Sequence, residues 1–133
     1  MPMRLLIVDD SPALRKALRA TLDSHDDWQV CGEAANGREG IEKAQQLKPD
    51  LIVLDLAMPV MNGLDAAREL TRLSPSVPLV MYTSYETAHL KREVFSAGVK
   101  GIVSKHESAE ALVSSIQALL GTCFLRARLQ VSP

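Results

Sequence analysis

Residues 49–59 read PDLIVLDLAMP, an apolar run enclosed by proline and acidic residues. Four consecutive apolar side chains, Leu51 to Leu54, lead directly into Asp55. A short and uninterrupted apolar run of this kind is typical of a strand that is buried on both faces of a parallel sheet. The segment therefore predicts a central strand with a carboxylate at its carboxyl end.

Four similar apolar runs occur elsewhere in the chain, at Leu5–Val8, Trp28–Cys31, Leu79–Tyr82 and Ile102–Val103. The segments between them have helical spacing, most clearly in the stripe Leu14, Ala17, Leu18, Thr21 and Leu22. Turn-type pairs such as Asn36-Gly37 and Asn62-Gly63 separate these segments. Strands alternating with helices predict a parallel sheet covered on both faces, with right-handed crossovers.

The expected fold is α/β, a doubly wound five-stranded parallel sheet of (βα)5 type. Gln29 interrupts the second apolar run between Trp28 and Val30, and this alternation favours a half-buried edge strand. The known flavodoxin-like strand order, 2-1-3-4-5, places the second strand at an edge. Gly121 is expected to end the last helix, so residues 1–121 form the expected domain and residues 122–133 a tail or linker stub.

The composition indicates an ordinary soluble domain. Apolar residues make up 47% and charged residues 23% of 133 residues, with a formal net charge of −1. The charge does not favour a nucleic-acid partner, and no apolar run approaches the length of a membrane helix or a signal peptide. Cys31 and Cys123 show no metal-binding spacing, which favours reduced thiols and a cytoplasmic location.

Polar residues follow four of the five predicted strands, as Asp9-Asp10, Asp55, Thr83-Ser84 and Ser104-Lys105. Ligands of open α/β sheets bind at the carboxyl ends of the strands. Clustered carboxylates repel one another, and a hard divalent cation such as Mg²⁺, with Mn²⁺ as an alternative, relieves that repulsion. Asp10, Asp55 and the backbone carbonyl of Ala57 are the expected direct ligands, and Asp9 is expected to hold a metal-bound water.

The same residues suit phosphoryl transfer. Asp55 is placed to attack phosphorus as a carboxylate nucleophile, while Lys105 and the hydroxyl of Thr83 neutralise oxygen charge on the phosphoryl group. Each residue alone has an ordinary structural explanation, since paired aspartates precede many helices and lysines are usually solvated. Their joint occurrence at the ends of four different strands favours a common site.

These motifs resemble those of response-regulator receiver domains. The resemblance covers Met3 to about Gly121 and rests on Leu6–Pro12, Pro49–Pro59 with Asn62-Gly63, Val80–Ser84 and Gly101–Lys105. It implies that Asp55 is the phospho-acceptor and that Asp9 and Asp10 hold magnesium. It further implies that Thr83, followed by Ser84, is the switch hydroxyl, that Lys105 binds phosphate and that a sensor histidine kinase is the donor.

Two positions depart from the common family pattern. Ile102 stands where many members have an aromatic switch residue, and a β-branched side chain cannot make the same rotamer change. His106 follows the lysine where many members have proline, which resembles the subgroup that precedes LuxR-type DNA-binding domains. By resemblance, Ala57 and Tyr85 tune the lifetime of the phosphoryl group, and this small-plus-bulky pair predicts a fairly long-lived phospho-form.

The resulting expectation is a regulatory domain, and not an enzyme, that switches its helix4-strand5-helix5 face and controls a DNA-binding domain absent from this chain. A phosphorylation-dependent homodimer is an open expectation. One alternative is a complete single-domain phosphorelay or protein-binding regulator. A second is a haloacid-dehalogenase-type phosphatase, which is disfavoured because Ala57 occupies the position of its general acid.

Overall fold

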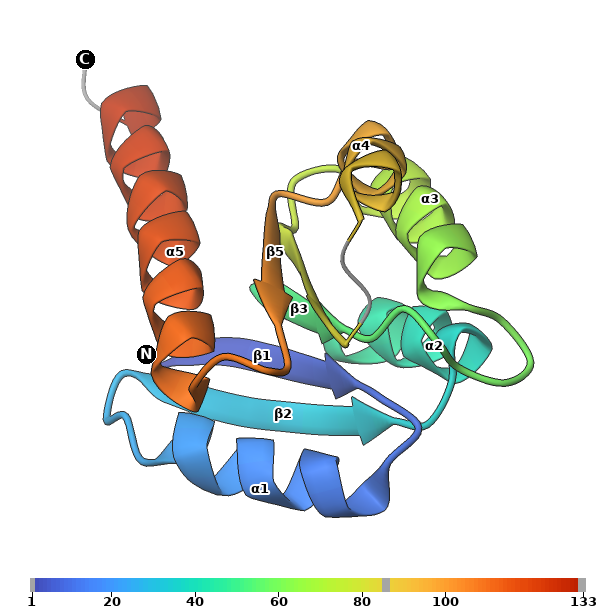
Figure 1. Ribbon diagram of the computed structural model, residues 1–133. Helices are drawn as coiled ribbons and strands as arrows, with labels where there is room; N and C mark the ends of the chain where they lie inside the picture. Colours follow the sequence, from blue (N-terminus) through green and yellow to red (C-terminus); the bar gives the residue numbers. More distant parts are fainter. Residues whose placement is uncertain (1, 85–86, 132–133) are drawn as a thin grey trace.

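The computed structural model describes the backbone of residues 2–84 and 87–131, with side chains through residue 121. Five parallel strands form one sheet in the order β2-β1-β3-β4-β5 (Figure 1). This arrangement confirms the doubly wound sheet and the flavodoxin-like strand order. It also confirms that the second strand, in which Trp28 and Val30 are buried and Gln29 is exposed, lies at an edge.

The elements alternate along the chain as the sequence predicts. The strands are β1 (Met3–Val8), β2 (Trp28–Ala34), β3 (Leu51–Leu54), β4 (Leu79–Thr83) and β5 (Gly101–Ser104). The helices are α1 (Pro12–Asp23), α2 (Gly37–Leu47), α3 (Gly63–Leu73), α4 (Ala88–Ser96) and α5 (Ala109–Val131). Within the described residues, none of these helices combines the length and the hydropathy needed to cross a bilayer.

Each face of the sheet has its own apolar core. Helices α1 and α5 cover one face, while α2, α3 and α4 cover the other (Figure 1). Leu5 and Ile7 of β1 pack with the first group, and Leu6 and Val8 pack with the second. Successive side chains of a strand point to opposite faces, so burial on both sides requires the uninterrupted apolar runs seen in the sequence.

Polar side chains begin the first four helices. Ser11, Asn36, Asn62 and Thr87 each accept a hydrogen bond from the backbone N–H three residues later. The pairs Asn36-Gly37 and Asn62-Gly63 are therefore helix starts, because each asparagine oxygen satisfies one of the unpaired N–H groups of the first turn. Both pairs lie at the boundary between a strand-to-helix connection and the following helix, as the sequence predicts, and the structure adds that each asparagine caps that helix.

Helix α5 continues through Gly121 to Val131. The expectation that Gly121 ends the helix was wrong. The backbone there lacks the positive φ of a glycine helix cap, and a glycine inside a helix costs only about 1 kcal/mol relative to alanine. The division into residues 1–121 and 122–133 stays a prediction, although the second part begins as a continuation of the helix.

Candidate functional site

Three aspartates meet at the carboxyl ends of two neighbouring strands. Asp9 and Asp10 follow β1, Asp55 follows β3, and the register of the strands sets Val8 beside Leu54. One oxygen from each carboxylate lies within 4.8 Å of the others. Asp9 and Asp55 are 2% and 6% exposed, whereas Asp10 is exposed at the rim. The ends of β1 and β3 therefore form an acidic pocket in which Asp9 and Asp55 are buried and Asp10 faces solvent.

A single ammonium group enters this pocket from β5. Lys105 Nζ donates to Asp9 Oδ2 at 2.8 Å and lies 3.3 Å from Asp55 Oδ1. The backbone also supplies donors, since the N–H of Ser11 bonds Asp9 Oδ1 at 2.9 Å and the N–H of Leu56 bonds Asp55 Oδ1 at 2.8 Å. One ammonium offsets one of three carboxylates, so the ionised cluster keeps an excess of two negative charges.

Burial and this excess of charge both act on the pKa of Asp55. Burial, followed by the negative charge of Asp9, raises the pKa of the Asp55 carboxyl group, and Lys105 and the Leu56 N–H only partly offset them. Burial by itself would lower the pKa of the Lys105 ammonium. Its hydrogen bonds and charge interactions with Asp9 and Asp55 outweigh burial, and the pKa of Lys105 is raised. The pocket therefore favours the charged form of Lys105 and disfavours the ionised form of Asp55.

Thr83 ends β4 beside the pocket and is 1% exposed. Its backbone carbonyl accepts a 2.8 Å hydrogen bond from the N–H of Lys105, so the two residues lie on adjoining strand ends as predicted. Ser84 follows Thr83 and is exposed to solvent. Tyr85, the second of the predicted lifetime-tuning positions, lies outside the described residues.

The loop after β3 carries Ala57, which is exposed, and Val60, which is 75% exposed with a φ of 67°. Gly63 closes this loop by donating its N–H to the Leu56 carbonyl at 2.7 Å. Ile102 is partly buried and packs against the core between the sheet and α2, α3 and α4. Ala57 therefore flanks the acidic pocket, while Ile102 lies on the side of β5 that faces α4.

Arg15 and Glu33, two charged residues beside the pocket, were not identified from the sequence. Arg15 of α1 donates from Nη1 to the Asp9 carbonyl at 2.6 Å and from Nε to Glu33 Oε1 at 3.1 Å. Arg19 also pairs with Glu33, through Nε to Oε2 at 2.8 Å. Arg15 and Glu33 are separated by 18 positions in the chain, so only the pairing of β1 with β2 predicts their contact.

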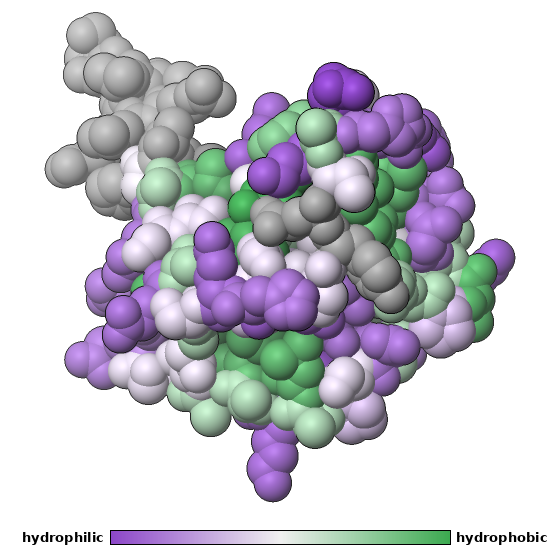
Figure 2. Space-filling view, in the orientation of Figure 1, coloured by the Kyte–Doolittle hydropathy of each residue, from purple (hydrophilic) through white to green (hydrophobic). Residues whose placement is uncertain are grey.

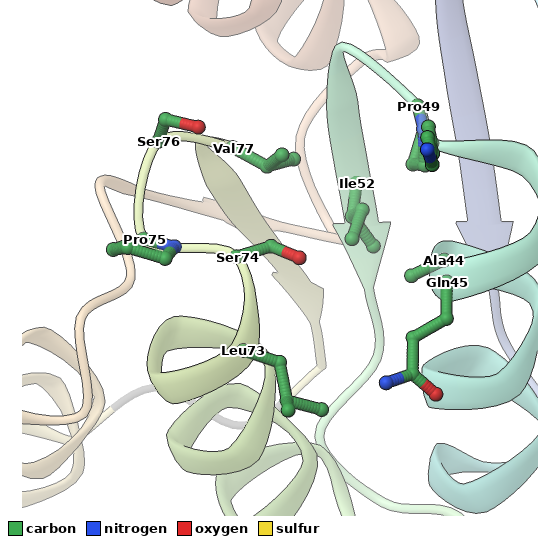
Figure 3. Close-up of a pocket in the computed structure, with 10 residues that line it drawn as sticks. Ala44, Gln45, Pro49, Ile52, Leu73, Ser74, Pro75, Ser76 and Val77 are labelled. Atoms are coloured by element: carbon green, nitrogen blue, oxygen red, sulfur yellow. The ribbon is translucent and has the colours of Figure 1, made fainter.

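A cavity of about 410 Å³ opens at the opposite end of the sheet. Its lining comes from the last turns of α2 and α3, the connections that follow them and the start of β3 (Figure 3), and includes Gln45, Pro49, Ile52, Leu73, Ser74 and Val77. Ile52 is near the amino end of β3, whereas Asp55 follows the carboxyl end. The cavity is therefore separate from the acidic pocket and plays no part in its chemistry.

Comparison with known proteins shows which family this chain resembles. The family described as "Response regulator receiver domain" matches residues 5–117. The chain is 41% identical over 123 residues to a protein-glutamate methylesterase/protein-glutamine glutaminase of Hahella chejuensis, with 90% of this chain and 31% of that protein covered. It is 34% identical to the chemotaxis protein CheY of Thermotoga maritima, with 87% and 96% covered. The chain spans only about a third of the methylesterase relative.

Solved structures agree with this relationship. The response regulator domain of Thermotoga maritima CheB superposes with a TM-score of 0.77 at 31% identity, covering 100% of both chains. A LuxR-family two-component response regulator from Aurantimonas superposes with a TM-score of 0.87 at 27% identity, covering 92% of this chain and 87% of that one. The chain therefore belongs to the family of response-regulator receiver domains.

Proposed function

We propose that this domain accepts a phosphoryl group on Asp55 from a sensor histidine kinase, in a reaction that requires Mg²⁺. One observation carries the proposal: the Asp55 carboxylate lies both in a cluster of three acids within 4.8 Å and 3.3 Å from the Lys105 ammonium. A nucleophilic oxygen, oxygen ligands for a hard cation and a fixed positive charge are the parts that phosphoryl transfer needs.

The donor set fits a magnesium ion. Only oxygen atoms are offered by Asp9, Asp10 and Asp55, and their ionised cluster has an excess of two negative charges after Lys105 is counted. Hard divalent cations, Mg²⁺ with Mn²⁺ as a substitute, prefer such ligands. These carboxylates and the backbone carbonyl of Ala57 would hold the ion. When bound, it would neutralise charge on the phosphoryl oxygens.

The protein's own groups account for the remaining chemistry. An Asp55 oxygen forms the new bond to phosphorus, while the bond from phosphorus to the donor histidine nitrogen breaks and that nitrogen keeps the electron pair. Lys105 then moves from the Asp55 carboxylate to a phosphoryl oxygen, and its hydrogen bond to Asp9 limits how far it travels. The Thr83 hydroxyl approaches the same group and draws Ser84 with it.

The proposed output is a change on the face formed by α4, β5 and α5. The loop after Thr83 leads into α4, where hydrophilic side chains gather on the surface in Figure 2. The exposed residues of α4 include Lys91 and Arg92, and also Phe95, which is 50% exposed. Ile102 packs against the same apolar core as Leu90 and Val94 of α4, so we expect movement of the loop to change how this helix packs. Partners that prefer the altered face then shift the population toward it.

Transcription control through an attached DNA-binding domain is the output that we propose, in the cytoplasm and with phosphorylation-dependent pairing of two chains. The LuxR-family structure and a Bacillus subtilis transcriptional regulatory protein, YdfI, which is 34% identical, support it. The methylesterase relatives and CheY support two other outputs, an attached enzyme or a single-domain regulator. The phosphoryl switch is common to all three proposals.

The test is phosphorylation by acetyl phosphate with and without Mg²⁺, read by intact mass. Wild type should gain one phosphoryl group only with the metal, and the Asp55→Asn variant should gain none. Asp26→Asn, a change at an exposed aspartate away from the pocket, is the matched control and should behave as wild type. Phosphorylation that persists in Asp55→Asn would refute the assignment. In the same assay Ala57→Asn should lose its phosphoryl group faster than the parent.

A further inference from the structure

We infer that Arg15, anchored by Glu33, is a positioning residue that fixes the peptide bond between Asp9 and Asp10 and thereby sets the pocket's affinity for Mg²⁺. The inference rests on the proposed function, because it assumes that this pocket binds the ion. The carbonyl that accepts the 2.6 Å hydrogen bond from Arg15 Nη1 belongs to the peptide unit that carries Asp10.

The backbone and the carboxylate of Asp9 are held by partners from several parts of the fold. Its N–H donates to the Ala34 carbonyl of β2 at 2.9 Å, and its carboxylate accepts from the Ser11 N–H and from Lys105. Its carbonyl accepts from Arg15. Asp9 is thus held through its backbone and its side chain, and Arg15 supplies the contact to the peptide unit that joins it to Asp10.

Asp10 depends on this backbone contact. Its side chain is exposed, and within the described part of the chain no side-chain hydrogen bond holds its carboxylate. The two peptide units that flank Asp10 therefore position it, one held by Arg15 at the Asp9 carbonyl and the other by the bond from the Ser11 N–H to Asp9 Oδ1. A charged guanidinium is a strong donor to a carbonyl, so Arg15 is well suited to prevent rotation of the Asp9–Asp10 peptide.

Glu33 holds the guanidinium in place. Arg15 Nε lies 3.1 Å from Glu33 Oε1, while the second oxygen, Oε2, is occupied by Arg19 at 2.8 Å. Lys43 of α2 donates to the backbone carbonyl of Glu33. The Arg15 and Glu33 side chains are 17% and 30% exposed, so water screens their pairing less than that of a surface pair. The edge strand is thereby connected to the acidic pair.

Electrostatics and positioning predict opposite results for loss of Arg15. A guanidinium repels a nearby divalent cation, so its removal would tighten Mg²⁺ binding if charge were its only influence. If Arg15 positions the peptide, its removal should weaken binding by about tenfold, the usual size of such outer contacts at metal sites. The sign of the change therefore separates the two explanations.

The experiment measures the Mg²⁺ dissociation constant by titration calorimetry on the purified chain. Arg15→Met should raise the constant about tenfold. Arg15→Lys should recover little, because lysine lacks the separated Nη1 and Nε donors that a planar guanidinium directs at the Asp9 carbonyl and at Glu33. Glu33→Gln keeps an acceptor for Arg15 and should stay close to wild type, whereas Glu33→Ala should not. Arg19→Met is the matched control, since it removes a cation from Glu33 without a contact to Asp9.

A second readout is amide hydrogen exchange in the metal-free protein at Ser11, whose N–H donates to Asp9 Oδ1 at 2.9 Å; exchange should quicken in Arg15→Met and Glu33→Ala but not in Arg19→Met. Circular dichroism and the urea midpoint show whether each variant is folded. Glu33→Ala retains Arg15 and carries the test if Arg15→Met does not fold. A folded Arg15→Met with unchanged or tighter Mg²⁺ binding would overturn the inference. Absence of Mg²⁺ binding in wild type would overturn the proposed function, and this inference with it.

Discussion

Replacing Asp55 by asparagine should stabilise the metal-free protein at pH 7. Burial and the neighbouring Asp9 raise the pKa of the Asp55 carboxyl group, so its ionised form is penalised in the folded state. At an effective dielectric of about 20, repulsion between the Asp55 and Asp9 carboxylates, which lie within 4.8 Å, costs about 3.5 kcal/mol or more, and attraction to Lys105 across 3.3 Å contributes about 5 kcal/mol. Desolvation of the carboxylate costs about several kcal/mol more and determines the net sign.

Asparagine removes the charge and keeps an oxygen that accepts from Lys105 and the Leu56 N–H. We expect the free energy of unfolding to rise by about 1–2 kcal/mol, which corresponds to an increase in Tm of about 3–10 °C for a domain of this size. The difference should be full above the folded-state pKa of Asp55 and vanish as the pH falls below its ordinary value, where both chains are neutral at this position.

Thermal unfolding in a chelator, followed by circular dichroism from pH 7 down to about pH 4, measures this difference. Asp26→Asn serves as the control and should match wild type at every pH. Added Mg²⁺ should reverse the order, because it stabilises the chain that binds it more tightly. An Asp55→Asn variant no more stable than wild type in the chelator at pH 7 would refute the reasoning that burial and repulsion dominate at this carboxylate.

Two further predictions concern the loop after β3. Gly63→Ala should lower the free energy of unfolding in urea by about 1–3 kcal/mol and slow phosphoryl uptake, because the added Cβ would lie 2.0 Å from the Asp55 carbonyl oxygen; normal stability and uptake would contradict the close approach. Val60→Gly should raise Tm slightly, because relief of about 1–2 kcal/mol of strain at φ 67° exceeds the entropic cost of glycine of about 0.5–1 kcal/mol. Val60→Ala keeps a Cβ and should show no such gain.

The strands and the acidic site were predictable because each depends on a rule that acts along the whole sheet. Leu51–Leu54 has no polar position, so its side chains can all be buried only if helices cover both faces of the sheet. Parallel strands then bring their carboxyl ends to one edge, which is why Asp9 and Asp55 could be grouped although 46 residues separate them. The roles of these residues in phosphoryl transfer stay predictions.

The features that were missed depend on individual side-chain geometry. Asn36-Gly37 has the composition of a turn, and only the bond from the Glu39 N–H to the asparagine oxygen makes it a helix start. Gly121 resembles a helix stop, but helix propensity is a weak preference that neighbouring residues override. The Arg15–Glu33 pair joins a helix to an edge strand, and no local pattern in either segment indicates the other.

The hydrogen bond from the Lys105 N–H to the Thr83 carbonyl has a mechanical consequence. It joins the last residue of β4 to the residue after β5. The backbone positions of Thr83 and Lys105, whose hydroxyl and ammonium flank the pocket, are therefore directly linked. We expect a displacement of Thr83 to be transmitted to the lysine through this backbone bond. Substitutions in that loop, at a distance from the acids, should therefore alter the charge balance around Asp55, and the pocket and the α4 surface should vary together among mutants.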